Sequence, residues 1–233
     1  MKSNSASTDQ ILRNRLKFLI YSNLHERLEK MRPYIWADLC AESDSLKFLQ
    51  WVRCSSNSKI YSPELEEFLE SWIQDEQRHA KNFEALYSHL YGISIDQIRK
   101  ILAARVSDFN TLAPFLEDEF SICVIIAYDE IATVKSYQQD IAFYDFLDKE
   151  VCGKFIRTVI KDEGKHFSNI LKVIAKCHRD RLTELPSKLH QLMELDLSRR
   201  EYRGTFVMDH AAFYFTPEVL SQCVTHILQY FRL

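Results

Sequence analysis

Two segments of the chain carry the same combination of acidic, basic and imidazole side chains. Residues 75–83 read Asp-Glu-Gln-Arg-His-Ala-Lys-Asn-Phe, and residues 162–170 read Asp-Glu-Gly-Lys-His-Phe-Ser-Asn-Ile. In both segments Glu precedes His by three residues, which places a carboxylate and an imidazole on one face of a helix. The neighbours on that face are apolar. Because burying an ionised carboxylate without a partner is costly, each segment needs a positively charged species beside it.

Two further glutamates, Glu42 and Glu130, lie on stripes of apolar residues at helical spacing. Glu42 precedes Glu76 by 34 residues, and Glu130 precedes Glu163 by 33. Each interval fits a helix, a turn and the next antiparallel helix. The sequence therefore predicts two similar helical hairpins that bring four carboxylates and two imidazoles together. The alternative reading, ion pairs on polar surface faces, conflicts with the apolar stripes.

The charges of these six side chains indicate what they bind. Four carboxylates with two neutral imidazoles are neutralised by two divalent cations, and oxygen ligands with imidazole suit iron or manganese. We therefore expect two iron ions, with a manganese–iron pair as the alternative. The predicted metal ligands are Glu42, Glu76, His79, Glu130, Glu163 and His166.

Other acidic residues near the motifs have expected roles of their own. Asp75 and Asp162 each stand one residue before a ligand glutamate, and we expect each to orient the histidine of the other hairpin. Asp38, one turn before Glu42, is an alternative ligand, but the stripe and spacing of Glu42 fit better. Glu119 is roughly 16 Å from the ligand glutamate further along its helix at about 1.5 Å per residue, so we expect it to interact with the helix dipole at a helix start.

The composition indicates which elements position these residues. Only four Gly and five Pro occur in 233 residues, so tight turns are few and long helices are favoured. The sequence predicts an all-α fold, and no glycine-rich phosphate-binding motif is present. The expected helices cover about residues 8–30, 36–54, 63–90, 95–106, 114–143 and 149–182, with two more beginning at 186 and 217.

No composition break divides the chain, so we expect a single domain over residues 1–233. Within it we expect a disordered tip at 1–9, a core bundle over about 34–182 and a helical extension over 183–233. The net charge of −3 argues against nucleic-acid binding. The longest apolar run, residues 122–128, is too short to cross a membrane. With no apolar leader and six scattered cysteines, the expected location is the cytoplasm.

Three stretches resemble the ferritin-like di-iron carboxylate superfamily, and most closely its acyl-carrier-protein desaturase branch. They are Trp72–His79 with its continuation Tyr91–Ile98, Glu130–Thr133, and Lys161–His166, within a similarity over roughly residues 36–180. The resemblance implies a ferritin-like four-helix bundle with additional N- and C-terminal helices. It implies that the six ligands named above bind iron and that Thr133, one turn beyond Glu130, is catalytic beside an oxygen pocket. Aldehyde-deformylating oxygenases and arylamine N-oxygenases carry related ligand sets.

These observations together predict an O2-activating non-haem di-iron oxidase or oxygenase. External electrons from a ferredoxin or a reductase would be needed, and the substrate would be an apolar or aromatic small molecule or an acyl chain. A homodimer is a possible assembly. Two alternatives stay open: a ferroxidase or iron-storage protein, and a metal-free interaction module. The expected substrate pocket is formed by Phe83, Val134, Tyr137, Phe167 and Ile170.

Overall fold

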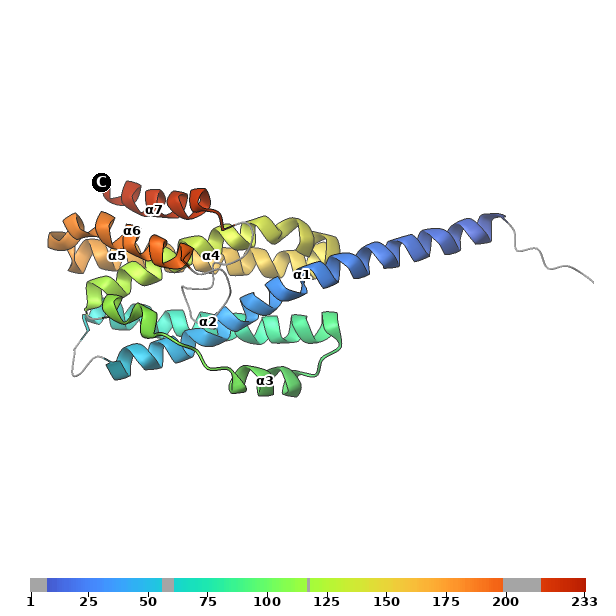
Figure 1. The fold of residues 1–233 in the computed structure, drawn as a ribbon, viewed down its shortest axis with the longest axis horizontal. Helices are drawn as coiled ribbons and strands as arrows, with labels where there is room; N and C mark the ends of the chain where they lie inside the picture. The colour runs from blue at the N-terminus through green and yellow to red at the C-terminus, as the bar shows by residue number, and fades with distance from the viewer. Residues whose placement is uncertain (1–7, 56–60, 117, 199–214) are drawn as a thin grey trace, which may run out of the picture.

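The structure is a computed structural model that describes residues 8–55, 61–116, 118–198 and 215–233, without the side chains of 8–22 and 55. Its described residues form helices and no strand (Figure 1). Among them, none of the helices is both long enough and apolar enough to cross a membrane. The α-helices are α1 (Thr8–Ser55), α2 (Pro63–Tyr91), α3 (Ile95–Ala104), α4 (Glu119–Asp148), α5 (Lys154–Cys177), α6 (Leu185–Leu197) and α7 (Pro217–Phe231).

Several predicted helix ends are confirmed by their capping geometry. The Ser62 side chain accepts a hydrogen bond from the backbone N–H of Leu65 at the start of α2. That helix ends at Gly92, whose φ of 65° lies in the left-handed region that glycine adopts without a steric penalty. Ser94 caps α3 and Thr216 caps α7 in the same way as Ser62 caps α2.

The first two expected helices are instead one continuous helix, α1, with Pro33 inside it. A proline in a helix interior costs roughly 3 kcal/mol because it removes a hydrogen bond and crowds the preceding turn. The residues that follow it on α1, Ile35, Leu39 and Cys40, are fully buried, and α1 packs along α2. Burial of this face offsets the cost of the proline, so the helix continues.

The start of α4 also differs from the expectation. Pro114 lies in a short 3-10 turn, Asn110–Phe115, and α4 begins at Glu119, where the Asp118 side chain accepts from the Ser121 N–H. The helix continues past residue 143 to Asp148. A π-helical turn, Lys149–Gly153, then joins it directly to α5. The predicted helix 149–182 is thus divided, since α5 ends at Cys177 and a 3-10 turn, Arg179–Glu184, follows.

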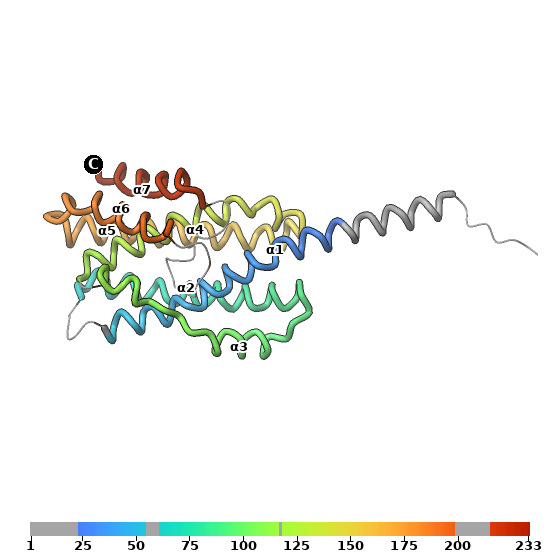
Figure 2. Tube along the Cα trace, viewed as in Figure 1, coloured from blue at the N-terminus to red at the C-terminus, as the bar shows by residue number. Residues whose placement is uncertain are grey.

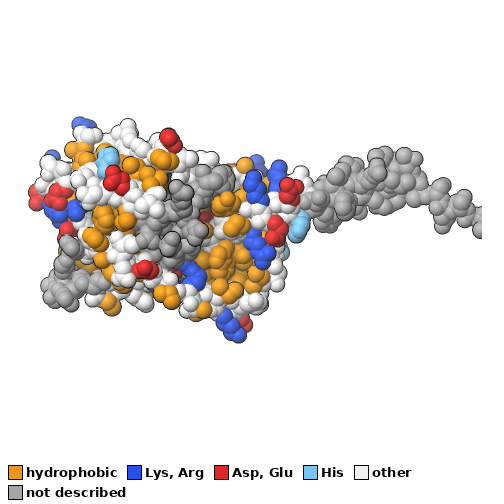
Figure 3. Space-filling view, in the orientation of Figure 1, with side chains coloured by type: hydrophobic (Ala, Val, Ile, Leu, Met, Phe, Trp, Pro, Cys, Tyr) orange, Lys and Arg blue, Asp and Glu red, His pale blue; other side chains and the backbone are white. Residues whose placement is uncertain are grey.

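The long helices associate as two pairs. α1 packs against α2, α4 packs against α5, and α2 contacts α5 across the middle (Figures 1 and 2). α6 and α7 pack on each other and on α4. All of residues 120–132 of α4 are buried, so this helix has no solvent face over that stretch. Around these helices, Figure 3 shows apolar and charged side chains interspersed on one face of the molecule.

Buried apolar residues form two clusters separated by a polar layer. Along α2 the first cluster includes Trp72 and the second includes Phe83. Along α5 the order is reversed, with Val159 in the second cluster and Phe167 in the first. α2 and α5 are therefore antiparallel, and the two Glu-x-x-His motifs lie at the same level between the clusters.

The expectations for the chain ends are only partly within the described residues. Residues 1–7 of the expected disordered tip lie outside them, whereas Thr8 and Asp9 belong to α1. Residues 199–214 of the expected C-terminal extension also lie outside them, and the described parts of that extension are α6 and α7.

Candidate metal centre

The structure brings the six predicted ligands together from four helices. α1 supplies Glu42, α2 supplies Glu76 and His79, α4 supplies Glu130, and α5 supplies Glu163 and His166. Each of the six is at most 5% exposed. Ligand atoms lie within 4.8 Å of one another in two overlapping groups that could each hold a metal ion: Glu42, Glu76, His79 and Glu163, and Glu76, Glu130, Glu163 and His166. Two carboxylates, those of Glu76 and Glu163, belong to both groups.

The Nδ1 atoms of both histidines face the carboxylates. His79 Nδ1 lies 2.9 Å from Glu163 Oε1 and 3.4 Å from Glu42 Oε2. His166 Nδ1 lies 2.9 Å from Glu163 Oε2 and 3.4 Å from Glu130 Oε2. The arrangement is thus nearly repeated in the two helical pairs, with Glu163 at its middle.

The Nε2 atoms point outward to aspartates on the opposite helix. His166 Nε2 lies 3.2 Å from Asp75 Oδ2, within hydrogen-bond distance. His79 Nε2 lies 3.6 Å from Asp162 Oδ2, which is beyond it. Arg78 lies between the two aspartates and forms ion pairs with both. Asp75 thus contacts the imidazole of the other helical pair by a hydrogen bond, whereas Asp162 lies near its imidazole without one.

Several polar atoms that face the centre have no hydrogen-bond partner within the described part of the chain. A buried polar atom left unpaired costs about 1–3 kcal/mol, more when the group is charged. His79 Nδ1 is close to Glu163 Oε1, yet the ring N–H is not aligned for a hydrogen bond. Atoms that converge without pairing fit a shared cationic partner, and this donor set suits iron or manganese. The unpaired inward atoms are Glu42 Oε2, Glu76 Oε1, His79 Nδ1, Glu130 Oε2 and Glu163 Oε1.

The buried carboxylates shift the pKa values of their neighbours strongly. Burial by itself would lower the pKa of His79, but Glu42 and Glu163 outweigh it and raise that pKa to about 10. Glu130 and Glu163 likewise raise the pKa of His166 to about 11 against the effect of burial. Burial and four neighbouring carboxylates raise the pKa of Glu76 well above its usual value. Without a metal, protons therefore offset the negative charge of the centre.

A small cavity adjoins the carboxylates, and neither histidine lines it. Its volume is about 20 Å³, enough for a water-sized molecule. Thr133, the predicted catalytic residue, lines it together with Tyr137 and Asp129. The other residues around it are Ala41 and the four ligand glutamates Glu42, Glu76, Glu130 and Glu163.

Of the five residues expected to form the substrate pocket, only Tyr137 lines this cavity. Phe83 stacks on Tyr137 with ring centroids 5.8 Å apart. Phe167 and Ile170 belong to the apolar cluster on the other side of the polar layer. Val134 is half-buried. An apolar substrate pocket formed by these five residues stays a prediction.

Two aromatic contacts to the ligands were not foreseen from the sequence. Trp72 Nε1 donates a hydrogen bond to Glu130 Oε1 at 2.7 Å. Tyr137 OH donates to Glu42 Oε1 at 2.6 Å. The available signal was helical spacing, because Trp72 stands one turn before Glu76 on the same face.

The structure also locates the other acidic residues that the sequence analysis considered, Asp38 and Glu119. Glu42, and not Asp38, belongs to the group that could hold a metal. Glu119 accepts hydrogen bonds from the backbone and side chain of Ser62, and His178 Nε2 lies 3.1 Å from it. Glu119 thus ties the start of α4 to the start of α2, far from the centre.

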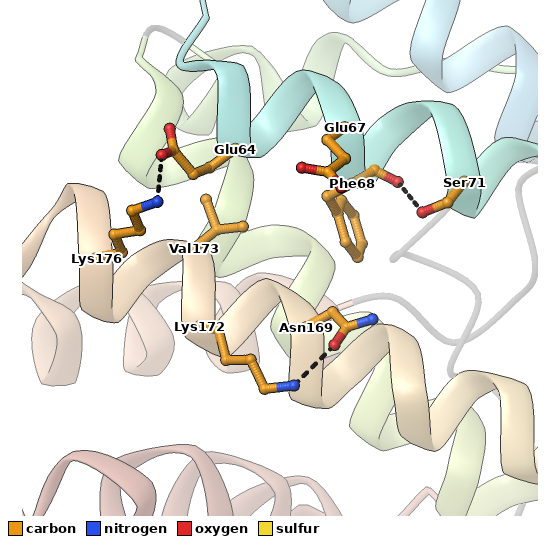
Figure 4. A pocket seen from close by; sticks show the side chains of 8 residues that line it. All are labelled: Glu64, Glu67, Phe68, Ser71, Asn169, Lys172, Val173 and Lys176. Carbon is orange, nitrogen blue, oxygen red and sulfur yellow. Dashed lines mark hydrogen bonds and ion pairs between the residues drawn. The ribbon is translucent and has the colours of Figure 1, made fainter.

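A separate groove of about 290 Å³ lies between α2 and α5 (Figure 4). An ion pair between Lys176 and Glu64 closes one end of it, and Lys172 donates to Asn169 within it. Phe68 lines its floor. Of the charged side chains of this groove, Lys176 and Glu64 are thus engaged with each other, and Lys172 is engaged with Asn169.

Comparison of this chain with family models, with curated proteins and with solved structures finds no match. The function of the centre is therefore inferred from its own residues.

Proposed function

We propose that this protein is a di-metal carboxylate oxidase or oxygenase built on a ferritin-like four-helix bundle. The observation that carries the proposal is the pair of four-residue groups that share Glu76 and Glu163, with unpaired ligand atoms facing inward. Two divalent cations would balance four carboxylates and allow both imidazoles to lose their extra protons. With two iron ions bound, such a site supplies reductive activation of O2 when external electrons arrive.

Individual residues around the centre would have separate roles in binding the metal, orienting its ligands and holding protons. Glu76 and Glu163 would contribute to both metal positions, while Glu42 and Glu130 would each contribute to one. Asp75 would keep His166 oriented through its hydrogen bond, and Asp162 lies beside His79 for the same role. Thr133 and Tyr137 present hydroxyl groups at the cavity beside the carboxylates, where they are placed to hold a proton or a small polar molecule. The two apolar clusters exclude bulk water from the centre.

A second candidate function, a ferroxidase, is favoured by the size of the cavity. A volume of about 20 Å³ admits a water-sized molecule but not an acyl chain. Oxidation of iron itself needs no organic substrate beside the centre. In that case iron is the substrate as well as the metal bound at the centre.

One experiment separates the two functions. The protein is loaded with Fe(II) without oxygen, exposed to O2, and then given a one-electron donor. An oxygenase or oxidase is expected to keep its iron through repeated cycles, with O2 consumption that depends on the donor. A ferroxidase is expected to oxidise excess Fe(II) without a donor and to elute as a large cage in size-exclusion chromatography. If the protein binds no iron at all, neither function stands.

A further inference from the structure

The centre has two halves that share Glu76 and Glu163: the Glu42 half contains Glu42 and His79, and the Glu130 half contains Glu130 and His166. In each half the unshared glutamate accepts a hydrogen bond from an aromatic side chain, but the donors differ. Trp72 Nε1 donates to Glu130 Oε1 at 2.7 Å, and Tyr137 OH donates to Glu42 Oε1 at 2.6 Å. In both glutamates Oε2 is then the atom 3.4 Å from the nearby imidazole Nδ1. Each aromatic side chain thereby determines which carboxylate oxygen faces the metal position.

Neither donor is part of the repeated motif. Glu76 and Glu163 are 87 residues apart, so the residue that corresponds to Trp72 is Val159. Glu42 and Glu130 are 88 residues apart, so the residue that corresponds to Tyr137 is Leu49. Val159 and Leu49 are both buried and apolar. The two donors are therefore separate additions to the two halves.

The histidines differ between the halves as well. In the half that contains Glu130, His166 is within hydrogen-bond distance of Asp75, at 3.2 Å. In the half that contains Glu42, the corresponding distance from His79 to Asp162 is 3.6 Å. Trp72 and Tyr137 are both buried, but only Tyr137 lines the cavity, and the indole of Trp72 is rigid. The Glu130 half thus has its ligands fixed more completely than the Glu42 half.

We propose that Trp72 and Tyr137 are positioning residues that each serve one metal position, and that the Glu130 half fills first. Ligands held in the bound orientation lose less freedom when the metal arrives, so the better fixed half binds more tightly. The proposal rests on the proposed function, because it requires two metal positions.

The test is an oxygen-free titration of the metal-free full chain with Co(II), in which calorimetry measures the binding. The wild-type protein is expected to bind in two resolved steps. Trp72→Phe is expected to weaken the first step and Tyr137→Phe the second, each by about 10–100-fold, as is typical for loss of a residue that orients a metal ligand. Glu130→Gln and Glu42→Gln assign the steps, because the first should remove the tight step and the second the weak one.

Matched controls use the same substitutions away from the centre. Trp51 packs on Phe109, and Tyr128 is a buried α4 residue that donates to Asp196. Trp51→Phe and Tyr128→Phe should leave both binding constants unchanged. Circular dichroism of each metal-free variant reports whether it is folded.

A measurement on the wild-type protein avoids dependence on the variants. The chain has three tryptophans, and their ¹⁵N indole signals can be followed during a titration with diamagnetic Zn(II). The Trp72 signal should move with the first equivalent of metal, while the signals of Trp36 and Trp51 should stay in place.

The outcomes are distinguishable. If the wild-type protein binds no metal, the proposed function fails. If it binds metal in two steps and neither aromatic variant changes them, the positioning roles are wrong. If the Trp72 signal moves only with the second equivalent, or Tyr137→Phe weakens the tight step, the order of filling is wrong.

Discussion

The two helical pairs present the same ligands from very different surroundings. In the first pair, α2 buries one face and exposes the other. In the second pair, α4 is buried on all sides over residues 120–132 because α6 and α7 cover it. Despite this difference, Glu42 and Glu130 are almost equally buried and take equivalent contacts. The centre thus depends on the apolar layers above and below it, not on what lies outside each helix.

The largest effect is expected from removing a ligand that both halves share. Glu163→Ala takes away the carboxylate that both histidines approach at 2.9 Å. We expect it to abolish binding at both positions, measured by metal analysis after anaerobic loading and desalting. Glu84→Gln, at a buried carboxylate paired with Arg99 away from the centre, is the control and should bind as the wild type does. Retention of metal by Glu163→Ala would show that the halves are independent.

The packing of α6 on α4 can be weakened without changing a predicted metal ligand. Leu189 on α6 is fully buried in the cluster that contains the apolar residues of the first half of α4. Leu189→Ala should lower the free energy of unfolding by about 3 kcal/mol, since removing a buried leucine side chain typically costs about 2–5 kcal/mol. Urea denaturation measures this loss.

Metal content is the second readout for Leu189→Ala, and we expect it to be unchanged. Ile101→Ala, at a position that is 41% exposed, serves as the control and should cost less than about 1 kcal/mol. Loss of metal with a modest loss of stability would mean that α6 takes part in forming the centre.

The same contrast explains what the sequence could and could not predict. The one-sided faces of α2 and α5 made Glu76 and Glu163 readable, because apolar and polar residues alternate there with helical period. In α4 every residue from 120 to 132 is buried, so Glu130 was predicted from its apolar neighbours at helical spacing and its 33-residue distance to Glu163, not from a contrast with a polar face. Helix ends with local capping signals, such as Ser62 and Gly92, were predicted correctly.

The features that depend on packing between helices were not predicted from the sequence. The continuation of α1 through Pro33 depends on packing against α2, which no local pattern reports. The start of α4 was placed at Pro114 because proline favours a first helical turn, but the Asp118 cap sets it later. The hydrogen bonds of Trp72 and Tyr137 join different helices and appear only once the helices are packed.

Two buried aspartates, one from each pair, differ in their partners. Asp44 on α1 accepts from Ser107 at 2.7 Å and pairs with Arg105 at 2.8 Å. Asp140 on α4 has one oxygen, Oδ2, without a hydrogen-bond partner among the described residues. Burial raises the pKa of Asp140 to about 6. Its ionised form therefore destabilises the folded protein.

Asp140→Asn should accordingly raise stability at pH 7.5 by about 1–2 kcal/mol, part of the roughly 3 kcal/mol that a two-unit pKa shift represents. The gain should become small near pH 3.5, where the aspartate is mostly protonated even in the unfolded chain, and grow as the pH rises to about 6. Urea denaturation at the two pH values measures it. An equal gain at both would contradict the assigned cause, and Asp44→Asn should instead lose stability.

The smallest effect concerns a glycine found in only one of the two motifs. Gly164 occupies the position of Gln77 in the first motif, and a Cβ there would meet no atom within 4 Å. Gly164→Ala should therefore stabilise the protein by about 0.5–1 kcal/mol through helix propensity. Thermal unfolding measures the gain, and metal content should be unchanged.

Gly153 in the π-helical turn is the matched control for Gly164. A Cβ at this position would collide with the side chain of Asp145 and crowd Arg157, which form an ion pair. Gly153→Ala should therefore stabilise the protein less than Gly164→Ala does, because the ends of the Asp145 and Arg157 side chains must move aside. An equal gain from both substitutions would contradict a role for the space around the glycine.

The direct junction at Lys149–Gly153 has a consequence for how the chain folds. α4 and α5 are joined by a turn of five residues, so their association closes a very short loop. α2 and α4 are separated by the stretch from Gly92 to Asp118, and loop-closure entropy rises with length. Because local contacts form early, we expect α4 and α5 to pair first. The segment that carries Glu130, Glu163 and His166 would then serve as the template on which the rest of the centre assembles.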